Sequence, residues 1–474
     1  MLFSTLTFLF VFLPIVLAGY YLINGRFKNI FLLIASLFFY AWGEPKFVLV
    51  MMATIIMNYV VALFIQVGGG IFRKLALSVS ICMSIGVLFV FKYLNFVTLN
   101  LSRFSPDVPV TNIALPIGIS FFTFQGISYV VDVYREPEIR AEKNLINVGL
   151  YIAFFPQLIA GPIVRYNTIS EQIHNRKTTW DGFCMGARRF LIGLFKKILL
   201  SNNFAIVADN AFDCNELSVS FAWIGAVAYA MQIFFDFSGY SDMAIGLGKM
   251  FGFQFEENFN YPYISRSVTE FWRRWHISLS TWFRDYVYIP LGGDGRRAGA
   301  ENKSAFLNVR NLFLVWLLTG IWHGASWNFL VWGLVYFVLL VLEKFYIHPE
   351  SFAAASWKGV LWRIFTMSAV LVEWVIFRSN GLKGAGAYIA CMFGISGNSF
   401  VDGNAVFYAR EYIVLFVISL FCAAPIVKKL GEYCEGRNKI LYTAGGTLGY
   451  ILLFIFAISY LVMGSHNPFI YFNF

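Results

Sequence analysis

The sequence predicts an all-α polytopic integral membrane protein, and three observations support this fold class. Of its 474 residues, 59% are hydrophobic and only 13% are charged, whereas a soluble globular chain carries about 25% charged residues. Apolar runs recur from Phe3 to Met463, and no polar stretch between them is long enough to form a separate soluble domain. The 36 basic and 26 acidic residues lie in short segments between these runs, as topology signals and lipid headgroup contacts do. We therefore expect one membrane domain over residues 1–474, in contact with the lipid bilayer and not with nucleic acid.

The N-terminal third contains four apolar runs. About 20 apolar residues are needed to cross a hydrocarbon layer of about 30 Å, so runs 2–23, 47–66 and 75–97 are predicted spans and run 29–42 a shorter, tilted one. The first run has neither a basic start nor a small-residue cleavage site, so we expect it to be retained as a helix. Placing the basic residues between the runs in the cytoplasm leaves the N-terminus outside.

Three more spans are predicted at the other end of the chain, at 360–377, 412–427 and 440–463. Four basic residues put the loop before the last span in the cytoplasm: Lys428, Lys429, Arg437 and Lys439. The aromatic tail, residues 467–474, is then expected to face out.

The middle of the chain does not alternate in this way. Basic segments 135–143, 165–197, 266–310 and 344–363 all favour the cytoplasm, so the three apolar stretches between them are expected to enter the membrane and return. Each contains a break, at 154–162, 236–242 and 320–324. Broken helices at membrane depth need protein or a water-filled cavity around them, which predicts a central polar cavity lined by the three breaks.

His323 is the first candidate for chemistry. It is the one ionisable residue of the 32-residue apolar stretch 311–342, which as a straight helix would be about 48 Å long. The stretch must fold back, and Gly320 to Gly324 offer the bend, with Trp322 and Asn328 nearby. An ionisable residue inside a membrane is a functional candidate by default; the alternative is a neutral histidine bonded to a carbonyl freed by the break.

His276 is the second candidate. Apolar residues over 265–290 recur at the spacing of an amphipathic helix, with Arg273, Arg274 and Arg284 opposite, so an interfacial helix is expected. On a helical wheel His276 lies at the edge of the apolar stripe, beside Arg273. It could stand at the mouth of the cavity or simply pair with lipid phosphate.

Asp236 and Asp242 flank the second break. Either carboxylate could orient an imidazole, but a structural bond to an arginine or to backbone N–H groups is the favoured interpretation. The six cysteines show neither a disulfide framework nor a zinc spacing, and we expect no metal and no bound cofactor. No nucleophile motif is present. A lone histidine base then indicates direct transfer of an acyl group to a hydroxyl acceptor.

Five motifs of this chain occur in the order found in the membrane-bound O-acyltransferase family, which the chain resembles over nearly its whole length. They are Leu115-Pro-Ile-Gly-Ile-Ser-Phe-Phe122, Phe154-Phe-Pro-Gln-Leu-Ile-Ala-Gly-Pro-Ile163, Asp236-Phe-Ser-Gly-Tyr-Ser-Asp242, Phe271-Trp-Arg-Arg-Trp-His-Ile-Ser-Leu-Ser280 and Thr319-Gly-Ile-Trp-His-Gly324. The chain looks most like the bacterial polysaccharide branch of the family.

The resemblance implies a ring of about 10–12 transmembrane and re-entrant helices around a central tunnel. Residues 1–112 would be N-terminal helices, 113–345 the catalytic core and 346–474 C-terminal helices. His323 matches the family's catalytic histidine and His276 its second histidine. Seven residues would line the tunnel or hold the donor: Trp322, Asn328, Trp272, Arg273, Tyr240, Asp236 and Asp242. Trp322, Asn328 or a freed backbone N–H could stabilise the oxyanion.

In this branch the donor would be acetyl-CoA, and the acetyl group would pass across the bacterial inner membrane. A periplasmic acetyltransferase partner would receive it, and an exopolysaccharide such as alginate would be the final acceptor. The alternatives are transfer of D-alanyl groups, or of acyl groups to lipid or protein, within the same superfamily. A transporter without chemistry is also an alternative, because broken helices mark transport sites as well.

Overall fold

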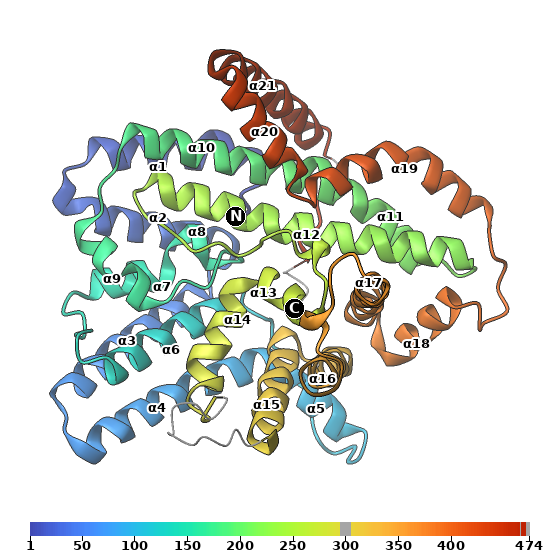
Figure 1. Cartoon of the computed structure of the whole chain (residues 1–474). Coiled ribbons are helices and arrows are strands. Elements are labelled where there is room, and N and C mark those ends of the chain that lie inside the picture. Colours follow the sequence, from blue (N-terminus) through green and yellow to red (C-terminus); the bar gives the residue numbers. More distant parts are fainter. Residues whose placement is uncertain (294–304, 465, 471–474) are drawn as a thin grey trace. The chain divides into compact units, whose positions relative to one another are not determined.

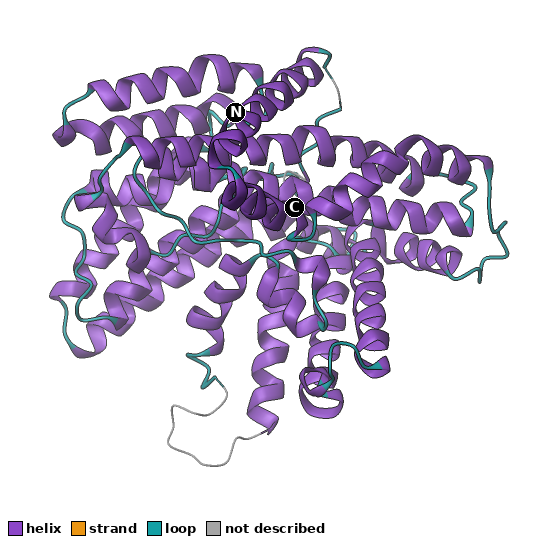
Figure 2. Cartoon of the chain, turned by 45° about the horizontal axis from the view of Figure 1, so that its top comes forward, coloured by secondary structure: helices purple, strands orange, loops and turns teal. Residues whose placement is uncertain are grey.

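The computed structural model describes residues 1–293, 305–464 and 466–470. Within these residues the chain consists of helices joined by loops and turns, and it contains no strand (Figure 2). Residues 294–304 of the basic segment and the last four residues of the aromatic tail lie outside the described part, so the predictions made for them are not addressed.

The helices form two compact units. The first comprises residues 1–190 and 240–257, and the second residues 191–239 and 258–474. Figure 1 labels the helices of both. The first unit holds α1 (Leu13–Leu22), α2 (Lys28–Gly43), α3 (Val48–Val67), α4 (Gly70–Leu88), α5 (Leu94–Ser102), α6 (Ile119–Arg135), α7 (Leu145–Ala153), α8 (Phe155–Leu158) and α9 (Tyr166–Asn175).

Helices α10 (Trp180–Phe195) and α12 (Val219–Met250) contribute residues to both units. The second unit holds α11 (Asn202–Phe212), α13 (Val268–Arg274), α14 (Ile277–Phe283), α15 (Ala305–His323), α16 (Trp327–Leu342), α17 (Trp357–Arg378), α18 (Gly381–Met392), α19 (Gly403–Cys422), α20 (Ile426–Arg437) and α21 (Lys439–Val462).

Nine helices of the described residues are long and apolar enough to cross a membrane, in addition to the shorter apolar segment Phe8–Leu22. Helices occur at every span predicted for the two ends of the chain, which confirms a multi-pass membrane protein. The spans differ in their surroundings: 72% of the apolar window of α12 is buried, against 6% of that of α21. An apolar helix that protein does not cover must face lipid, so α21 is a peripheral helix and α12 an interior one.

Two of the three predicted helix breaks are confirmed. Helix α7 ends at Ala153 and α8 begins at Phe155, and α15 ends at His323 before α16 begins at Trp327. The break predicted at 236–242 is wrong, because α12 is one helix of 32 residues. Gly239 serves close packing instead: a Cβ there would lie 2.8 Å from the carbonyl oxygen of Gly193. The chain turns back at residues 213–218, between α11 and α12.

The single amphipathic helix predicted over 265–290 is also wrong. The structure has two short helices, α13 and α14, and a π-helical turn at Arg284–Tyr288. The helices are separated at Trp275 and His276, and His276 adopts left-handed backbone angles (φ 44°, ψ 53°). Apolar spacing does not report such a reversal, because the residues on either side still point into the same core.

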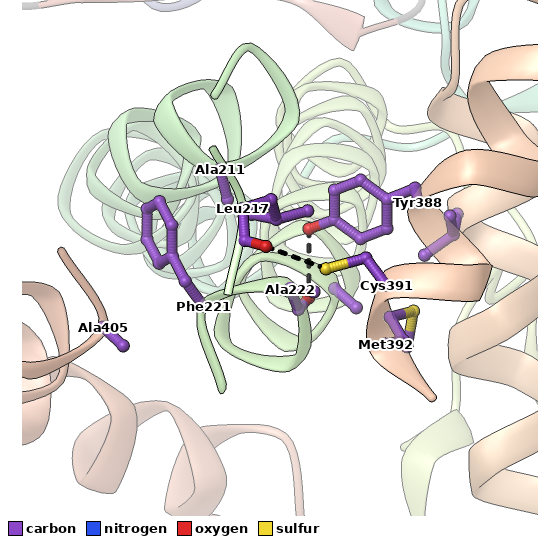
Figure 3. Packing of buried hydrophobic residues seen from close by; sticks show 10 residues of the cluster. Ala211, Leu217, Phe221, Ala222, Tyr388, Cys391, Met392 and Ala405 are labelled. Carbon is purple, nitrogen blue, oxygen red and sulfur yellow. Dashed lines mark hydrogen bonds between the residues drawn. The ribbon is translucent and has the colours of Figure 1, made fainter. Parts of the chain in front are cut away.

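A hydrophobic core in the second unit fixes α17, the helix that supplies part of the histidine site (Figure 3). Val375 of α17 packs there with side chains of α11, α12, α18 and α19. Two polar atoms of the cluster are satisfied by backbone: the Tyr388 hydroxyl donates to the Ala222 carbonyl (3.0 Å) and the Cys391 thiol to the Leu217 carbonyl (3.0 Å). This packing holds α17 two residues before Phe377 and includes neither histidine.

Candidate active site

His323 is the last residue of α15 and lies at the break that the sequence predicts. The hairpin of α15 and α16 places it there, and two glycines bring the two helix backbones together. A Cβ on Gly333 would lie 2.5 Å from the Trp316 carbonyl oxygen, and one on Gly320 would lie 2.5 Å from that of Phe329. Small residues at helix contacts allow this approach in membrane proteins.

Aromatic rings enclose the His323 imidazole, which is 6% exposed. Its ring centroid lies 4.8 Å from Trp332 of α16, 5.2 Å from Phe377 of α17 and 4.9 Å from the neighbouring Trp322. Aromatic rings from α15, α16 and α17 therefore surround the imidazole.

His276 belongs to the same unit and is fully enclosed, contrary to the helix-boundary position expected for it. It forms the N-terminal cap position of α14 and is 1% exposed. Its ring lies 4.5 Å from Phe237 and 6.1 Å from Trp322. The Trp322 ring therefore lies near both histidine rings, so the fold brings His276 and His323 into the same site.

Asn258 fixes the tautomer of His276. The Asn258 Oδ1 accepts hydrogen bonds from the Ser278 backbone N–H (3.2 Å) and hydroxyl (2.8 Å), so this atom is an oxygen, and His276 Nδ1 lies 3.1 Å from it. Since an oxygen can only accept, Nδ1 carries the proton and Nε2 the lone pair. The Nε2 atom is buried and has no hydrogen-bond partner among the described residues. Burial lowers the pKa of His276 to about 3, so this imidazole is a neutral acceptor near pH 7.

Trp272 and Arg273 are adjacent in sequence but occupy different environments. The Trp272 ring is buried against Trp316 (4.8 Å) and Tyr336 (5.0 Å). The Arg273 side chain is 69% exposed and lies 3.4 Å from Glu350. Trp272 packs among the aromatic rings of the site. Arg273 lies on the surface, where its charge is accessible from solvent.

Glu343 fixes the N-terminal end of α13, the helix that carries Trp272. Its buried carboxylate accepts from the backbone N–H groups of Val268 (2.7 Å) and Thr269 (2.8 Å), and from the indole N–H of Trp362 (3.1 Å). The side chain of Ser267 also accepts from the Glu270 backbone N–H. A carboxylate at a helix N-terminus satisfies N–H groups that the helix leaves open.

The two aspartates of the Asp236–Asp242 motif take the structural role favoured from the sequence. Asp236 is buried 2.6 Å from Lys197 and accepts from the Ile470 backbone N–H (3.0 Å). Asp242, in the first unit, accepts from Arg189 Nε at 2.7 Å. Tyr240 is also in the first unit, where its ring stacks on Phe3 at 4.5 Å. The structure thus gives all three a packing or ion-pairing partner other than an imidazole.

The oxyanion role considered for Asn328 is wrong in this structure. Its amide nitrogen donates to the carbonyls of Ile376 (3.2 Å) and Ser379 (2.6 Å), at the C-terminal end of α17. Both N–H groups are thus already used. Asn328 joins α16 to the end of α17 and does not present a donor to a substrate.

Several residues of the site were not found from the sequence. Trp332 and Phe377 lie in runs of apolar residues without any distinguishing pattern, and Asn258 stands 18 residues before its partner His276. Glu373, one turn before Phe377, is a carboxylate within an apolar run; it is 2% exposed, and its Oε2 has no hydrogen-bond partner among the described residues. For Trp332, Phe377 and Asn258 only the fold supplies the signal.

Comparison with known proteins gives a consistent result. The model of the membrane-bound O-acyltransferase family matches residues 88–377, a range that contains both histidines. The chain is 39% identical to a probable alginate O-acetylase of Azotobacter vinelandii over the full length of both. It is 32% identical to a peptidoglycan O-acetyltransferase of Helicobacter pylori, covering 100% of this chain and 98% of that one. A teichoic acid D-alanyltransferase of Bacillus subtilis is 31% identical over 59% of this chain and 73% of its own.

Proposed function

Because this chain belongs to the membrane-bound O-acyltransferase family, we propose that it takes an acetyl group from acetyl-CoA and passes it across the inner membrane for O-acetylation of an exopolysaccharide. The chain is a multi-pass membrane acyltransferase, which sets the transporter alternative aside. The observation that carries the proposal is the pair of buried histidines, His323 and His276, whose rings both lie near that of Trp322. The full-length similarity to O-acetylating relatives supports acetyl as the group transferred.

In the proposed reaction, neutral His323 accepts the proton of the acceptor hydroxyl while the hydroxyl oxygen attacks the thioester carbonyl carbon. The new C–O bond forms, the C–S bond breaks, and the thiolate of coenzyme A leaves and takes up the proton that His323 accepted, which returns His323 to its neutral form. Trp332 is a candidate donor to the oxyanion, because its Nε1 is buried without an acceptor among the described residues and its ring adjoins His323. The exposed Arg273 is a candidate contact for the donor's phosphates.

Two partners are proposed on the periplasmic side of the membrane, where the acetyl group arrives. A periplasmic acetyltransferase would receive the acetyl group and place it on the polysaccharide, with alginate as one candidate suggested by the names of the relatives. D-Alanyl transfer is the second candidate, because a teichoic acid D-alanyltransferase is 31% identical over 59% of this chain. Its lower coverage makes it the weaker of the two.

The test uses the full chain in lipid nanodiscs with radiolabelled acetyl-CoA. Thioester loss and label on added polysaccharide or partner protein are measured for the wild type and for His323→Ala, with the exposed His348→Asn as the matched control. We expect acetyl-CoA consumption by the wild type and the control and none by His323→Ala. Consumption that persists in His323→Ala rejects the assigned base, and a folded wild type that consumes only a D-alanyl carrier thioester favours the second candidate.

A further inference from the structure

A second site, remote in sequence from the histidines, lies within the first unit. Residues at the start of α2, at the start of α7 and at the end of α9 enclose a cavity of about 650 Å³. Arg26, Lys28, Arg176 and His174 line it. Among the described residues that line it there is no aspartate or glutamate. The lining therefore carries three basic side chains, Arg26, Lys28 and Arg176, and the carboxylate next to it is that of Glu142, beside His174.

Two of the cations share one aromatic ring. Lys28 Nζ lies 4.5 Å from the centre of the Tyr20 ring and the Arg176 guanidinium carbon lies 5.8 Å from it. Arg176 is held there by hydrogen bonds to the Tyr20 hydroxyl (3.1 Å) and to the Ile173 carbonyl (3.0 Å). Neither cation has an ion-pair partner among the described residues. Two positive charges close to the same ring repel each other. The positions of Lys28 and Arg176 therefore favour a bound anion that neutralises both charges.

The other polar groups around the cavity are compatible with an anion. Asn29 is fixed by hydrogen bonds from its amide to Asn147 Oδ1 (2.8 Å) and to the Ile173 carbonyl (3.1 Å). The Nε2 atom of His174 lies 2.7 Å from the Glu142 carboxylate, which is thereby turned toward His174. The first turns of α2 and α7 both contribute lining residues, and the N-terminal ends of helices carry partial positive charge.

Apolar side chains at the edge of the cavity indicate the source of the anion. Phe27 and Ile30 line it and are 53% and 37% exposed, and the nearby Leu22 is 86% exposed. A soluble phosphate would leave these side chains in water, whereas the acyl chains of a lipid would cover them. The positive-inside rule places Arg26 and Lys28 on the cytoplasmic side, where anionic lipid headgroups attract basic residues.

We propose that this cavity binds the phosphate group of an anionic phospholipid, such as phosphatidylglycerol, with Lys28 and Arg176 as its principal contacts. The lipid would tie α2, α7 and α9 together at the membrane surface. This site makes no use of the acetyl-transfer chemistry, so its test is independent of the proposed function.

The test measures binding in the full-length, delipidated protein in detergent. Phosphatidylglycerol is titrated while native mass spectrometry counts bound lipid and the unfolding temperature is recorded; phosphatidylcholine and inorganic phosphate are titrated in parallel. Each basic residue near an anionic surface contributes about a fivefold change in affinity. We expect Lys28→Gln to weaken phosphatidylglycerol binding about fivefold and Lys28→Gln with Arg176→Gln about 30-fold, while Lys28→Arg binds as the wild type does.

The matched control is Lys429→Gln with Arg437→Gln, which removes the same charge from exposed positions of α20. It should bind phosphatidylglycerol as the wild type does. Equal weakening in this control, or undiminished binding in Lys28→Gln, overturns the site. A stabilisation by inorganic phosphate as large as that by phosphatidylglycerol overturns the lipid assignment. Because Lys28 donates no hydrogen bond within the described residues, Lys28→Gln keeps the test decisive even if the Arg176 variant misfolds.

Discussion

His276 is held in an unfavourable backbone conformation at the centre of the site. A left-handed conformation at a residue other than glycine costs about 1–3 kcal/mol, and the structure retains it through Asn258. The Asn258 carbonyl accepts from the Ile277 N–H (2.9 Å), and its side chain bonds both His276 and Ser278. This conformation places a neutral imidazole beside Trp322, and its acceptor nitrogen has no hydrogen-bond partner within the described part of the chain.

The pH dependence of stability follows from this burial. The pKa of His276 is about 3 in the folded protein and about 6.5 in an unfolded chain. Between these values the unfolded state binds a proton that the folded state does not, so stability is complete above about pH 6.5 and falls by about 1.4 kcal/mol per unit as the pH is lowered. His276→Asn keeps an amide donor, tolerates the backbone angles and lacks the titration.

We therefore expect the unfolding temperature of the wild type to fall more steeply between pH 7 and pH 5 than that of His276→Asn. Thermal unfolding in nanodiscs at several pH values measures both slopes. Parallel curves for the two proteins would falsify the buried neutral state of His276.

Trp332 offers a separate prediction at the residue scale. Trp332→Phe keeps a ring against His323 but removes the indole N–H. If that N–H stabilises the oxyanion, the turnover number should fall about 100- to 1000-fold, with little change in the KM for the donor. The exposed Trp42→Phe is the control. A turnover number within threefold of the wild type in Trp332→Phe means that the oxyanion donor lies elsewhere.

The sequence reveals a site residue when its side-chain type is rare in its surroundings. His323 stands out because it is the one ionisable side chain in a long apolar stretch. The tryptophans and Phe377 do not, because aromatic residues make up 19% of the chain. Asn258 lies in a loop without periodicity, and only the folded structure shows that it bonds His276.

The α15–α16 hairpin is the element on which the position of His323 depends. Gly333 lets the α16 backbone approach the Trp316 carbonyl, so the methyl group of Gly333→Ala cannot fit unless the helices separate. We expect this change to cost about 1–3 kcal/mol of stability and to lower acetyl transfer more than tenfold by displacing His323. Gly384→Ala, on α18, is the control because its Cβ meets nothing within 4 Å. Unfolding temperature and turnover are measured on both, and equal behaviour contradicts a close-packed hairpin.

Sequence patterns predicted the existence of most helices but not every interruption. Pro156 and the Gly320 to Gly324 segment mark real breaks, because proline removes a donor and the second segment must reverse a run too long for the membrane. The Gly239 segment resembles them, yet its glycine serves helix contact and its aspartates are neutralised by Lys197 and Arg189. Whether a polar, glycine-containing segment breaks depends on such distant partners, which one segment's sequence does not contain.

At the scale of the whole molecule, the long helices of the middle region bear on its topology. Helices α10 and α11 lie within one apolar stretch of 33 residues, Trp180–Phe212, and α12 follows after a turn at residues 213–218. The stretch Trp180–Phe212 and α12 are each longer than the about 20 residues that a membrane span requires. The basic segments 165–197 and 266–310 can then both remain on the cytoplasmic side while the turn at residues 213–218 reaches the opposite surface. This topology satisfies the charge pattern without a break in the helix at Asp236.

The natural cysteines test this topology. Cys214 lies in the turn before α12, whereas Cys434 lies exposed on α20, between basic residues expected in the cytoplasm. In variants that retain one of these cysteines, a membrane-impermeant maleimide should label Cys214 in right-side-out vesicles and Cys434 only in inverted ones. Cys391, buried in the core, is the control and should react only after denaturation. Labelling of Cys214 from the cytoplasmic side instead would mean that α11 and α12 form a re-entrant hairpin. The 33-residue stretch Trp180–Phe212 and the 32-residue α12 would then have to lie obliquely in the bilayer, because neither fits upright within half of a layer of about 30 Å.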